Sequence, residues 1–209
     1  MTLARPLVSV IVPVLEEAAE LPRVLEHVGS LAGEWEVLVA EGPGRAARLN
    51  EAARGASGEL LLFLHADSRL PADAYLSLVS AAADPGVVGG NFALRFAGED
   101  RFSQVLTAVY TLQRRLGFYY GDSSVWVRRS VFEALGGYRE LAIMDDYDFV
   151  RRLEAAGRTE CLSGPATTSD RRWRAMGVPR TLFAWWAIRW LYLAGVPSER
   201  LGRLYRRIR

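Results

Sequence analysis

One short segment near the start of the chain restricts its possible folds most. Residues 7–14 (LVSVIVPV) are almost continuously apolar and rich in β-branched side chains, which is typical of a strand buried on both faces of a parallel sheet. The following segment, residues 17–30, has apolar residues at helical spacing. A strand followed directly by a helix is the repeating unit of α/β proteins, so we expect a mainly parallel sheet flanked by helices.

The same alternation continues along the chain. In this architecture ligands bind at the carboxyl ends of the strands, so polar residues that follow a strand are candidate site residues. A chain of 209 residues suits one domain, which we place at residues 1–170, with residues 171–209 as a helical extension of it. Further strands are expected at residues 36–40, 59–65, 87–96, 123–128 and 159–162, and helices at 45–54, 72–84, 102–116, 130–135 and 145–156.

Composition excludes several kinds of chemistry. All 26 basic residues are arginine, so the chain has neither a phosphate-loop lysine nor a Schiff-base lysine. Cys161 is the single cysteine, which rules out an intrachain disulfide and fits a reducing compartment. The first residues lack a signal-peptide pattern. We therefore expect a cytoplasmic protein.

Basic charge is concentrated at the end of the chain. Residues 1–169 carry a net charge of −6, whereas residues 170–209 carry +8. Within this region, residues 181–196 are apolar but contain Arg189, and sixteen residues are fewer than the ~20 that a membrane span needs. We expect an amphipathic helix within residues 181–209 that lies on an anionic membrane surface, at the inner face, or packs on its own domain or on a second subunit as a homodimer. Nucleic-acid binding is not expected.

Acidic residues follow three of the expected strands. They are Glu17, Glu41 and Asp67, the last of which follows His65 by two positions. Oxygen ligands favour a hard ion such as Mg²⁺ or Mn²⁺, and an ion held by one or two carboxylates commonly takes further ligands from substrate phosphates. Simpler explanations remain open: Asp67 caps the next helix, Glu17 is a favourable first-turn acid and His65 is a core histidine.

Two further clusters are candidates for chemistry. In Met144-Asp145-Asp146, at the expected start of a helix, a carboxylate can act as a general base toward an acceptor hydroxyl. The alternative is a capping box formed with Asp148. Arg171-Arg172-Trp173 offers two guanidinium groups for phosphate and an indole for the acceptor, although such a segment is also ordinary on an amphipathic surface.

Taken in order, these motifs resemble the family 2 glycosyltransferases, which have the GT-A fold. More narrowly, they resemble the bacterial subgroup associated with arsenosugar biosynthesis. The resemblance covers roughly residues 8–206 and depends on seven motifs: SVIVP (9–13) with Glu17, VLVAEG (37–42), GRAARLN (44–50), FLHADS (63–68), GGY (136–138), MDD (144–146) and RRW (171–173).

This resemblance implies a metal-dependent, inverting transfer of a sugar from a nucleoside-diphosphate sugar to a hydroxyl acceptor, either a small molecule or a lipid-linked one. Asp146 occupies the position of the catalytic base, with Asp145 beside it, and Asp67 that of the metal ligand, with Mg²⁺ or Mn²⁺ as the ion. Arg171, Arg172 and Trp173 would contact phosphate or acceptor. The nucleotide-sugar would lie against Pro13, Glu17, Glu41, Arg45, His65, Ala66 and Asp67.

The chain also departs from the family pattern. Glu41 stands where the family usually has aspartate, His65 stands in place of a carboxylate, and the loop, helix and strand expected after Gly42 are missing. Two alternatives are a degenerate nucleotide-sugar-binding or membrane-associated scaffold and a sugar nucleotidyltransferase. The second should have a glycine-rich loop after the first strand, where this chain has none.

Overall fold

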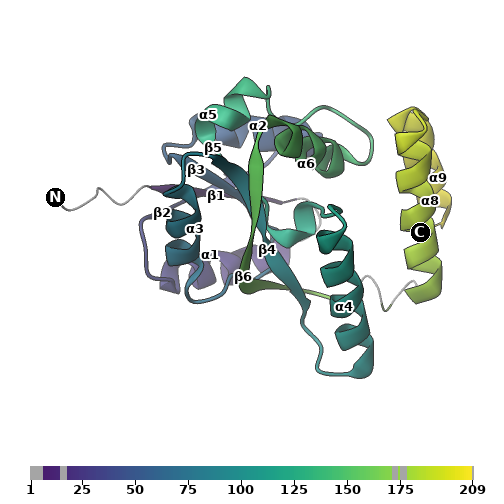
Figure 1. The fold of residues 1–209 in the computed structure, drawn as a ribbon, viewed down its shortest axis with the longest axis horizontal. Coiled ribbons are helices and arrows are strands. Elements are labelled where there is room, and N and C mark those ends of the chain that lie inside the picture. The colour runs from purple at the N-terminus through teal and green to yellow at the C-terminus, as the bar shows by residue number, and fades with distance from the viewer. Residues whose placement is uncertain (1–6, 15–17, 171–173, 175–177, 209) are drawn as a thin grey trace.

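Six strands form one mixed sheet in the order β2-β1-β3-β5-β4-β6 (Figure 1). The computed structural model describes residues 7–14, 18–170, 174 and 178–208. The first three strands pair in parallel, and β4 pairs in parallel with β6, whereas β5 is antiparallel to both β3 and β4. The strands are β1 (Val8–Pro13), β2 (Trp35–Ala40), β3 (Leu60–Phe63), β4 (Val87–Phe96), β5 (Trp126–Arg128) and β6 (Arg158–Thr168).

Helices cover both faces of the sheet, as the apolar run of β1 predicts. Val10 and Val12 face one core, which α1 (Leu21–Ser30) and α3 (Ala74–Ala82) cover. Ile11 faces the opposite core, which contains side chains from α2 (Arg45–Gly55), α5 (Arg129–Ala134) and α6 (Asp145–Ala156). Alternate residues of one strand thus enter two separate cores, and the expected α/β class is confirmed.

Several boundaries differ from those expected. The first helical segment is split into η1 (Ala18–Glu20) and α1, which has Pro22 in its first turn. Proline is tolerated there because its missing N–H has no partner within the helix. The last strand, β6, is much longer than residues 159–162, because it pairs with β4 along nearly its whole length. The antiparallel direction of β5 was not predicted, since three residues carry no directional signal.

Strand register brings the expected site residues to one edge of the sheet. Pro13 pairs with Ala40, and Ile11 pairs with Phe63. His65 therefore lies at the level of Pro13, and Glu41 lies one residue beyond it. Only residues 41–44 connect β2 to α2, with positive φ at Gly42 (111°) and Gly44 (75°). In the family that the sequence motifs resemble, a longer loop, a helix and a strand are expected after Gly42, and this short connection stands in their place.

Two C-terminal helices, α8 (Val178–Leu193) and α9 (Ser198–Ile208), pack against each other beside α4 (Arg101–Arg115) (Figure 1). We expected one amphipathic helix here, and α9 is amphipathic, with Leu201 buried and Arg203 exposed. Helix α8 differs because it is apolar on both sides: Ile188 is buried, whereas Phe183 and Trp190 are 68% and 51% exposed. Within the described ranges, no helix combines the length and apolarity that crossing a bilayer requires.

The β4–β6 pairing yields a stability prediction. A Cβ added at Gly90 would collide with the carbonyl of Glu160 on β6. Gly90→Ala should therefore lower the free energy of unfolding by about 1–3 kcal/mol, the usual cost of overpacking. Gly29→Ala is the control, because a Cβ there meets no atom within 4 Å in helix α1. That change should be neutral or stabilise by up to about 1 kcal/mol. Urea denaturation followed by circular dichroism measures both, and equal stabilities would contradict the pairing.

Candidate active site

An ion pair between Arg45 and Asp145 connects two helices at the carboxyl edge of the sheet. Arg45 is the first residue of α2, and Asp145 is the first residue of α6, one hundred positions later. The guanidinium Nη1 lies 2.6 Å from Asp145 Oδ2. Its Nη2 lies 3.3 Å from His65 Nε2, just beyond the end of β3. The Asp145 side chain is 11% exposed, so this ion pair is largely shielded from water.

Burial and charge act in opposite directions on this pair. Burial alone would lower the pKa of Arg45, but the charges of Asp145 and Asp146 outweigh it and raise that pKa above its usual value. For Asp145, burial is the largest influence and raises the pKa, the Arg45 charge opposes it, and the Asp146 charge adds to it. Arg45 is therefore the group that allows two adjacent carboxylates to be held at this edge.

Asp146 is held differently from its neighbour. Its Oδ2 accepts a hydrogen bond from the backbone N–H of Gly121 at 2.9 Å, and its Oδ1 accepts one from the N–H of Tyr147 at 2.7 Å. Gly121 begins the short helix η2 (Gly121–Ser123), which precedes β5. A Cβ at Gly121 would lie 2.9 Å from the Arg45 guanidinium and 3.2 Å from Asp146 Oδ2. Glycine thus lets the backbone approach the acid closely.

The start of α6 does not have the geometry of a simple capping box. Met144 is the N-cap and makes no side-chain capping hydrogen bond. Asp145 pairs with Arg45, and Asp148 pairs with Arg152 at 2.8 Å. Met144 has a φ of 69° in the left-handed region, which costs a non-glycine residue roughly 1–2 kcal/mol. Such strain is concentrated at functional sites in proteins.

A cavity of about 120 Å³ lies between this edge and helix α8. His65 and Asp146 line it from the sheet side. Helix α8 closes it with Trp185 and Arg189. Asp145 is not part of its wall, so Asp146 is the acid of the pair that faces the cavity. The remaining lining residues are Tyr110, Gln113, Tyr120, Asp122, Leu182 and Trp186.

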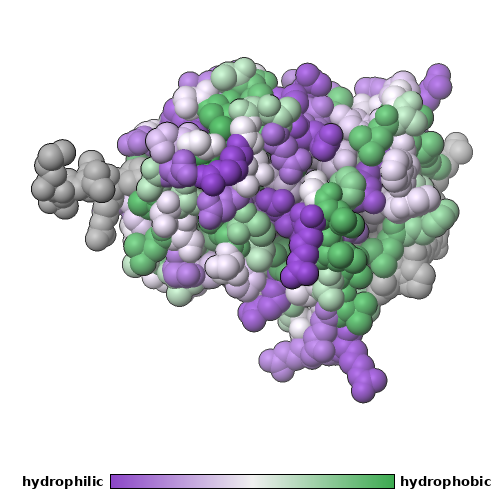
Figure 2. Space-filling model, viewed as in Figure 1, coloured by the Kyte–Doolittle hydropathy of each residue, from purple (hydrophilic) through white to green (hydrophobic). Residues whose placement is uncertain are grey.

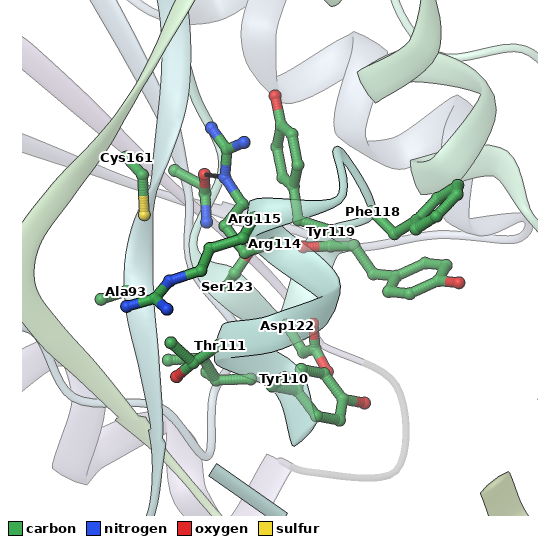
Figure 3. A pocket seen from close by; sticks show the side chains of 13 residues that line it. Ala93, Tyr110, Thr111, Arg114, Arg115, Phe118, Tyr119, Asp122, Ser123 and Cys161 are labelled. Atoms are coloured by element: carbon green, nitrogen blue, oxygen red, sulfur yellow. Dashed lines mark hydrogen bonds between the residues drawn. The ribbon is translucent and has the colours of Figure 1, made fainter. Parts of the chain in front are cut away.

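A second, larger cavity of about 360 Å³ adjoins the first (Figure 3). The two share Tyr110, Tyr120 and Asp122 in their walls. Its other walls come from β4, α4, the segment that follows α4 and Cys161 of β6, and their exposed surface is mostly apolar. Arg114 is fixed there by a 2.7 Å hydrogen bond to Asn91 and by the ring of Tyr119, whose centroid lies 4.2 Å from the guanidinium carbon.

Asp67 occupies a separate position. It lies two residues beyond His65, is partly exposed and is not in the wall of either cavity. Helix α3 begins at Ala74 with Asp73 as its N-cap, so Asp67 does not cap that helix. Among the described residues, no hydrogen bond or ion pair engages the Asp67 carboxylate.

The described residues contain no group of three or more histidine, cysteine, aspartate or glutamate side chains arranged to hold a metal ion. The Asp67 carboxylate alone fits an ion that takes most of its ligands from a diphosphate. His65 Nε2 is the nitrogen that faces Arg45, so this contact competes with any metal at that atom.

Other predicted site residues are placed as follows. Pro13 is the buried last residue of β1, Ala66 is buried and Glu41 is exposed. Glu17 and the Arg171-Arg172-Trp173 segment lie outside the described residues. Sequence reasoning missed Gly121, Asp122, the tyrosines shared by the cavities and Arg189. A glycine-aspartate pair after two tyrosines was the only available signal, and nothing in the sequence placed α8 over the site.

The ion pair can be tested by mutation. Arg45→Gln should lower the free energy of unfolding by about 2–4 kcal/mol at neutral pH, because it leaves Asp145 buried without a cation. The loss should be smaller for Arg45→Gln/Asp145→Asn, which removes both charges. In the single variant the folded-state pKa of Asp145 lies above its unfolded value, so the loss should grow as pH rises from the unfolded pKa to the folded one, level off above it and shrink toward pH 4. Denaturation at several pH values measures this, and additive, pH-independent losses would contradict it.

Part of the chain matches a known protein family. Residues 40–139 match the model of glycosyl transferase family 2. That range includes α2, the end of β3 and η2. No match was found among curated protein sequences.

Solved structures of similar fold include the mannosyltransferase PcManGT from Pyrobaculum calidifontis in complex with GDP-Man and Mn²⁺, with a TM-score of 0.62 and 21% identity over 88% of this chain and 61% of that one. Another is S. aureus TarS 1–349 in complex with UDP-GlcNAc, with a TM-score of 0.58 and 15% identity over 78% of this chain and 58% of that one. The chain thus spans about three fifths of the length of these proteins. The fold is that of GT-A glycosyltransferases, and the match over residues 40–139 supports a glycosyltransferase of family 2.

Proposed function

We propose that this protein transfers a glycosyl group from a nucleoside-diphosphate sugar to a hydroxyl acceptor, with Asp146 as the general base. The observation that carries the proposal is the division of roles between two adjacent acids. Asp145 is neutralised by Arg45, whereas Asp146 faces the cavity and is oriented by the Gly121 N–H. An ionised carboxylate held in this way can accept a proton from a hydroxyl within hydrogen-bond reach.

The transfer follows from this placement. Asp146 takes the proton of the acceptor hydroxyl while its oxygen forms a bond to the anomeric carbon. The bond from that carbon to the diphosphate oxygen breaks, and the nucleoside diphosphate leaves on the opposite face. We propose inversion at the anomeric carbon for this reason. Charge develops on the sugar ring as in glycoside hydrolysis.

The donor would lie along the edge formed by β1, β2 and β3. We propose that Pro13, Glu17, Glu41 and Ala66 contact the nucleotide, as the family pattern implies. Arg45 contacts both His65 and Asp145. We therefore propose that Arg45 and His65 lie at the sugar end of the donor and also orient Asp145. Arg171, Arg172 and Trp173 stay predicted contacts of phosphate or acceptor. A place in the arsenosugar-associated subgroup also stays a prediction.

We further propose that Asp67 holds Mg²⁺ or Mn²⁺ together with the donor diphosphate. A divalent ion there neutralises charge on the leaving group. The structure of PcManGT, which has a similar fold, was solved in complex with GDP-Man and Mn²⁺. A single carboxylate is a weak site for such an ion alone, so the nucleotide should be needed for tight binding.

Transfer is tested by incubating the protein with a panel of nucleoside-diphosphate sugars and Mn²⁺ or Mg²⁺, with release of nucleoside diphosphate as the readout. Asp146→Asn should lower turnover by roughly 10²–10⁴-fold, the range for loss of a general base, with little change in donor KM. Glu51→Gln, an exposed change on α2, serves as the control. Folded protein that turns over no donor would favour a scaffold, of the nucleotide-sugar-binding kind if it binds a donor and of the membrane-associated kind if it binds none. Nucleotide-sugar synthesis from a sugar phosphate would favour the nucleotidyltransferase.

Metal binding has a readout independent of turnover. The electron paramagnetic resonance signal of free Mn²⁺ should fall little on adding protein alone and strongly on adding protein with UDP or GDP. Asp67→Ala should weaken the ternary complex by at least about tenfold, since even outer-shell changes weaken metal sites by this factor. Equal Mn²⁺ binding by wild type and Asp67→Ala would exclude Asp67 as the ligand.

We also propose that residues 171–209 belong to the same domain and attach it to an anionic membrane surface, in keeping with a cytoplasmic protein peripheral at the inner face. The outer side of α8 exposes Phe183 and Trp190, and Trp186, which also lines the cavity, is exposed beside them. Arg200 and Arg203 are exposed on the adjacent α9. Figure 2 shows hydrophobic and hydrophilic atoms side by side at the right of the view, where these helices lie in Figure 1. Aromatic and basic side chains together suit a lipid interface.

Vesicle flotation tests the membrane proposal. Wild type should float with phosphatidylglycerol vesicles and not with phosphatidylcholine vesicles, and high salt should weaken the attachment. Phe183→Gln/Trp190→Gln should reduce flotation severalfold, whereas Leu76→Gln, an equally exposed apolar position on α3, should not. A dimer in solution that dissociates in the double variant, with no flotation of wild type, would show that a second copy covers this face instead.

A further inference from the structure

The cavity beside Asp146 contains a buried cation, Arg189, that forms no ion pair with any carboxylate of the described residues. Arg189 on α8 is 8% exposed and lines the cavity. Its Nη1 lies 3.4 Å from the hydroxyl of Tyr120, a long hydrogen bond, and its guanidinium carbon lies 4.4 Å from the centroid of the Phe118 ring. Its buried Nε has no hydrogen-bond partner. Asp122 and Asp146 line the same cavity, yet neither forms an ion pair with Arg189.

This arrangement is costly for the protein alone. A buried charge is normally paired or fully hydrogen-bonded, because removal from water is expensive. Arg45 and Arg152 follow that rule, each with an aspartate oxygen within 2.8 Å. The Phe118 ring offsets only part of the cost for Arg189. Arg189 lines the cavity and its guanidinium group is incompletely hydrogen-bonded, which is explained best by an anion that enters with a ligand.

The position of Arg189 indicates which substrate carries that anion. In the transfer proposed above, the base contacts the acceptor, while the diphosphate leaves on the opposite face of the sugar. Asp146 lines this cavity, and Asp67, the proposed ligand of the metal and diphosphate, does not. The cavity is thus the acceptor side of the site. It adjoins the larger, mostly apolar cavity, and the two share Tyr110, Tyr120 and Asp122 in their walls.

We propose that Arg189 binds a phosphate or carboxylate group of the acceptor, so that the natural acceptors are hydroxyl compounds that carry a negative charge. This inference rests on the proposed function, because it assigns the cavity to the acceptor. Arg189 is the one guanidinium in the wall of this cavity among the described residues. The rings of Tyr120 and Trp185 flank the same space and can pack on the carbon skeleton of the acceptor.

Calorimetric titration tests the proposal with three soluble probes: glycerol 3-phosphate, glycerate and glycerol. The anionic probes should bind wild type at least about tenfold more tightly than glycerol, the range for a hydrogen bond to a charged group. Arg189→Gln should remove this preference, and Arg189→Lys should keep part of it, since lysine retains the charge but not the planar fork. Arg54→Gln, at an exposed position of α2, should bind like wild type.

Further titrations distinguish a lipid acceptor from a soluble one and an acceptor site from a donor site. Dihexanoyl phosphatidylglycerol below its micelle concentration distinguishes a lipid acceptor from a soluble one: tighter binding than glycerol 3-phosphate indicates lipid. Equal affinity of wild type for charged and neutral probes would overturn the proposal, as would a preference that survives in Arg189→Gln. A loss of UDP or GDP binding in that variant, with anionic probes unaffected, would instead assign Arg189 to the donor and also overturn it. If Arg189→Gln does not fold, Arg189→Lys and the wild-type preference decide.

The two proposals fail in different ways. Transfer to neutral acceptors as efficient as transfer to anionic ones would refute the role of Arg189 and leave the glycosyltransferase proposal intact. Binding of the anionic probes through Arg189, in a protein that turns over no donor, would refute glycosyl transfer and leave the anion site.

Discussion

The ion pair between Arg45 and Asp145 is the interaction on which the rest of the site depends. Without Arg45, two adjacent carboxylates would be held together at a partly buried edge, and their repulsion would favour a proton on one of them. When Arg45 is present, Asp145 forms an ion pair with it, and Asp146 is the acid that faces the cavity. The same guanidinium contacts His65 and limits the space at Gly121. One side chain thus joins α2, β3, η2 and α6, elements far apart in the sequence.

The antiparallel strand β5 is what brings η2 into this group. Because β5 runs opposite to β3, its beginning lies at the edge where β3 ends, with Trp126 opposite Leu62. The residues just before it, Gly121–Ser123, therefore arrive beside His65 and Asp146. A parallel strand in that place would have delivered its preceding loop to the other edge. The reversal of one short strand supplies both the backbone donor for Asp146 and the aspartate shared by the two cavities.

Much of the fold could be predicted from the sequence because its signals are local. The apolar run of β1 and the helical spacing of α2 and α6 depend on residues close in the chain, and each lies close to its expected bounds. The acid pair was also recognised, although its division of roles was not. That division depends on Arg45, one hundred positions away, and no local pattern reports it. Arg189 was noted only as an interruption of an apolar segment, since the burial of the inner side of α8 against the domain is a tertiary property.

Helix α8 lines the cavity with one side and exposes apolar side chains on the other, and this arrangement has a thermodynamic consequence. One side closes the cavity through Trp185 and Arg189, and the opposite side carries Phe183 and Trp190 outward. A rigid helix transmits a displacement on one side to the other. Any surface or partner that binds the outer face more tightly in one position of α8 will therefore change affinity within the cavity, and a ligand in the cavity must alter attachment by the same factor. Ligand binding in the cavity and binding at the outer face of α8 then affect each other equally.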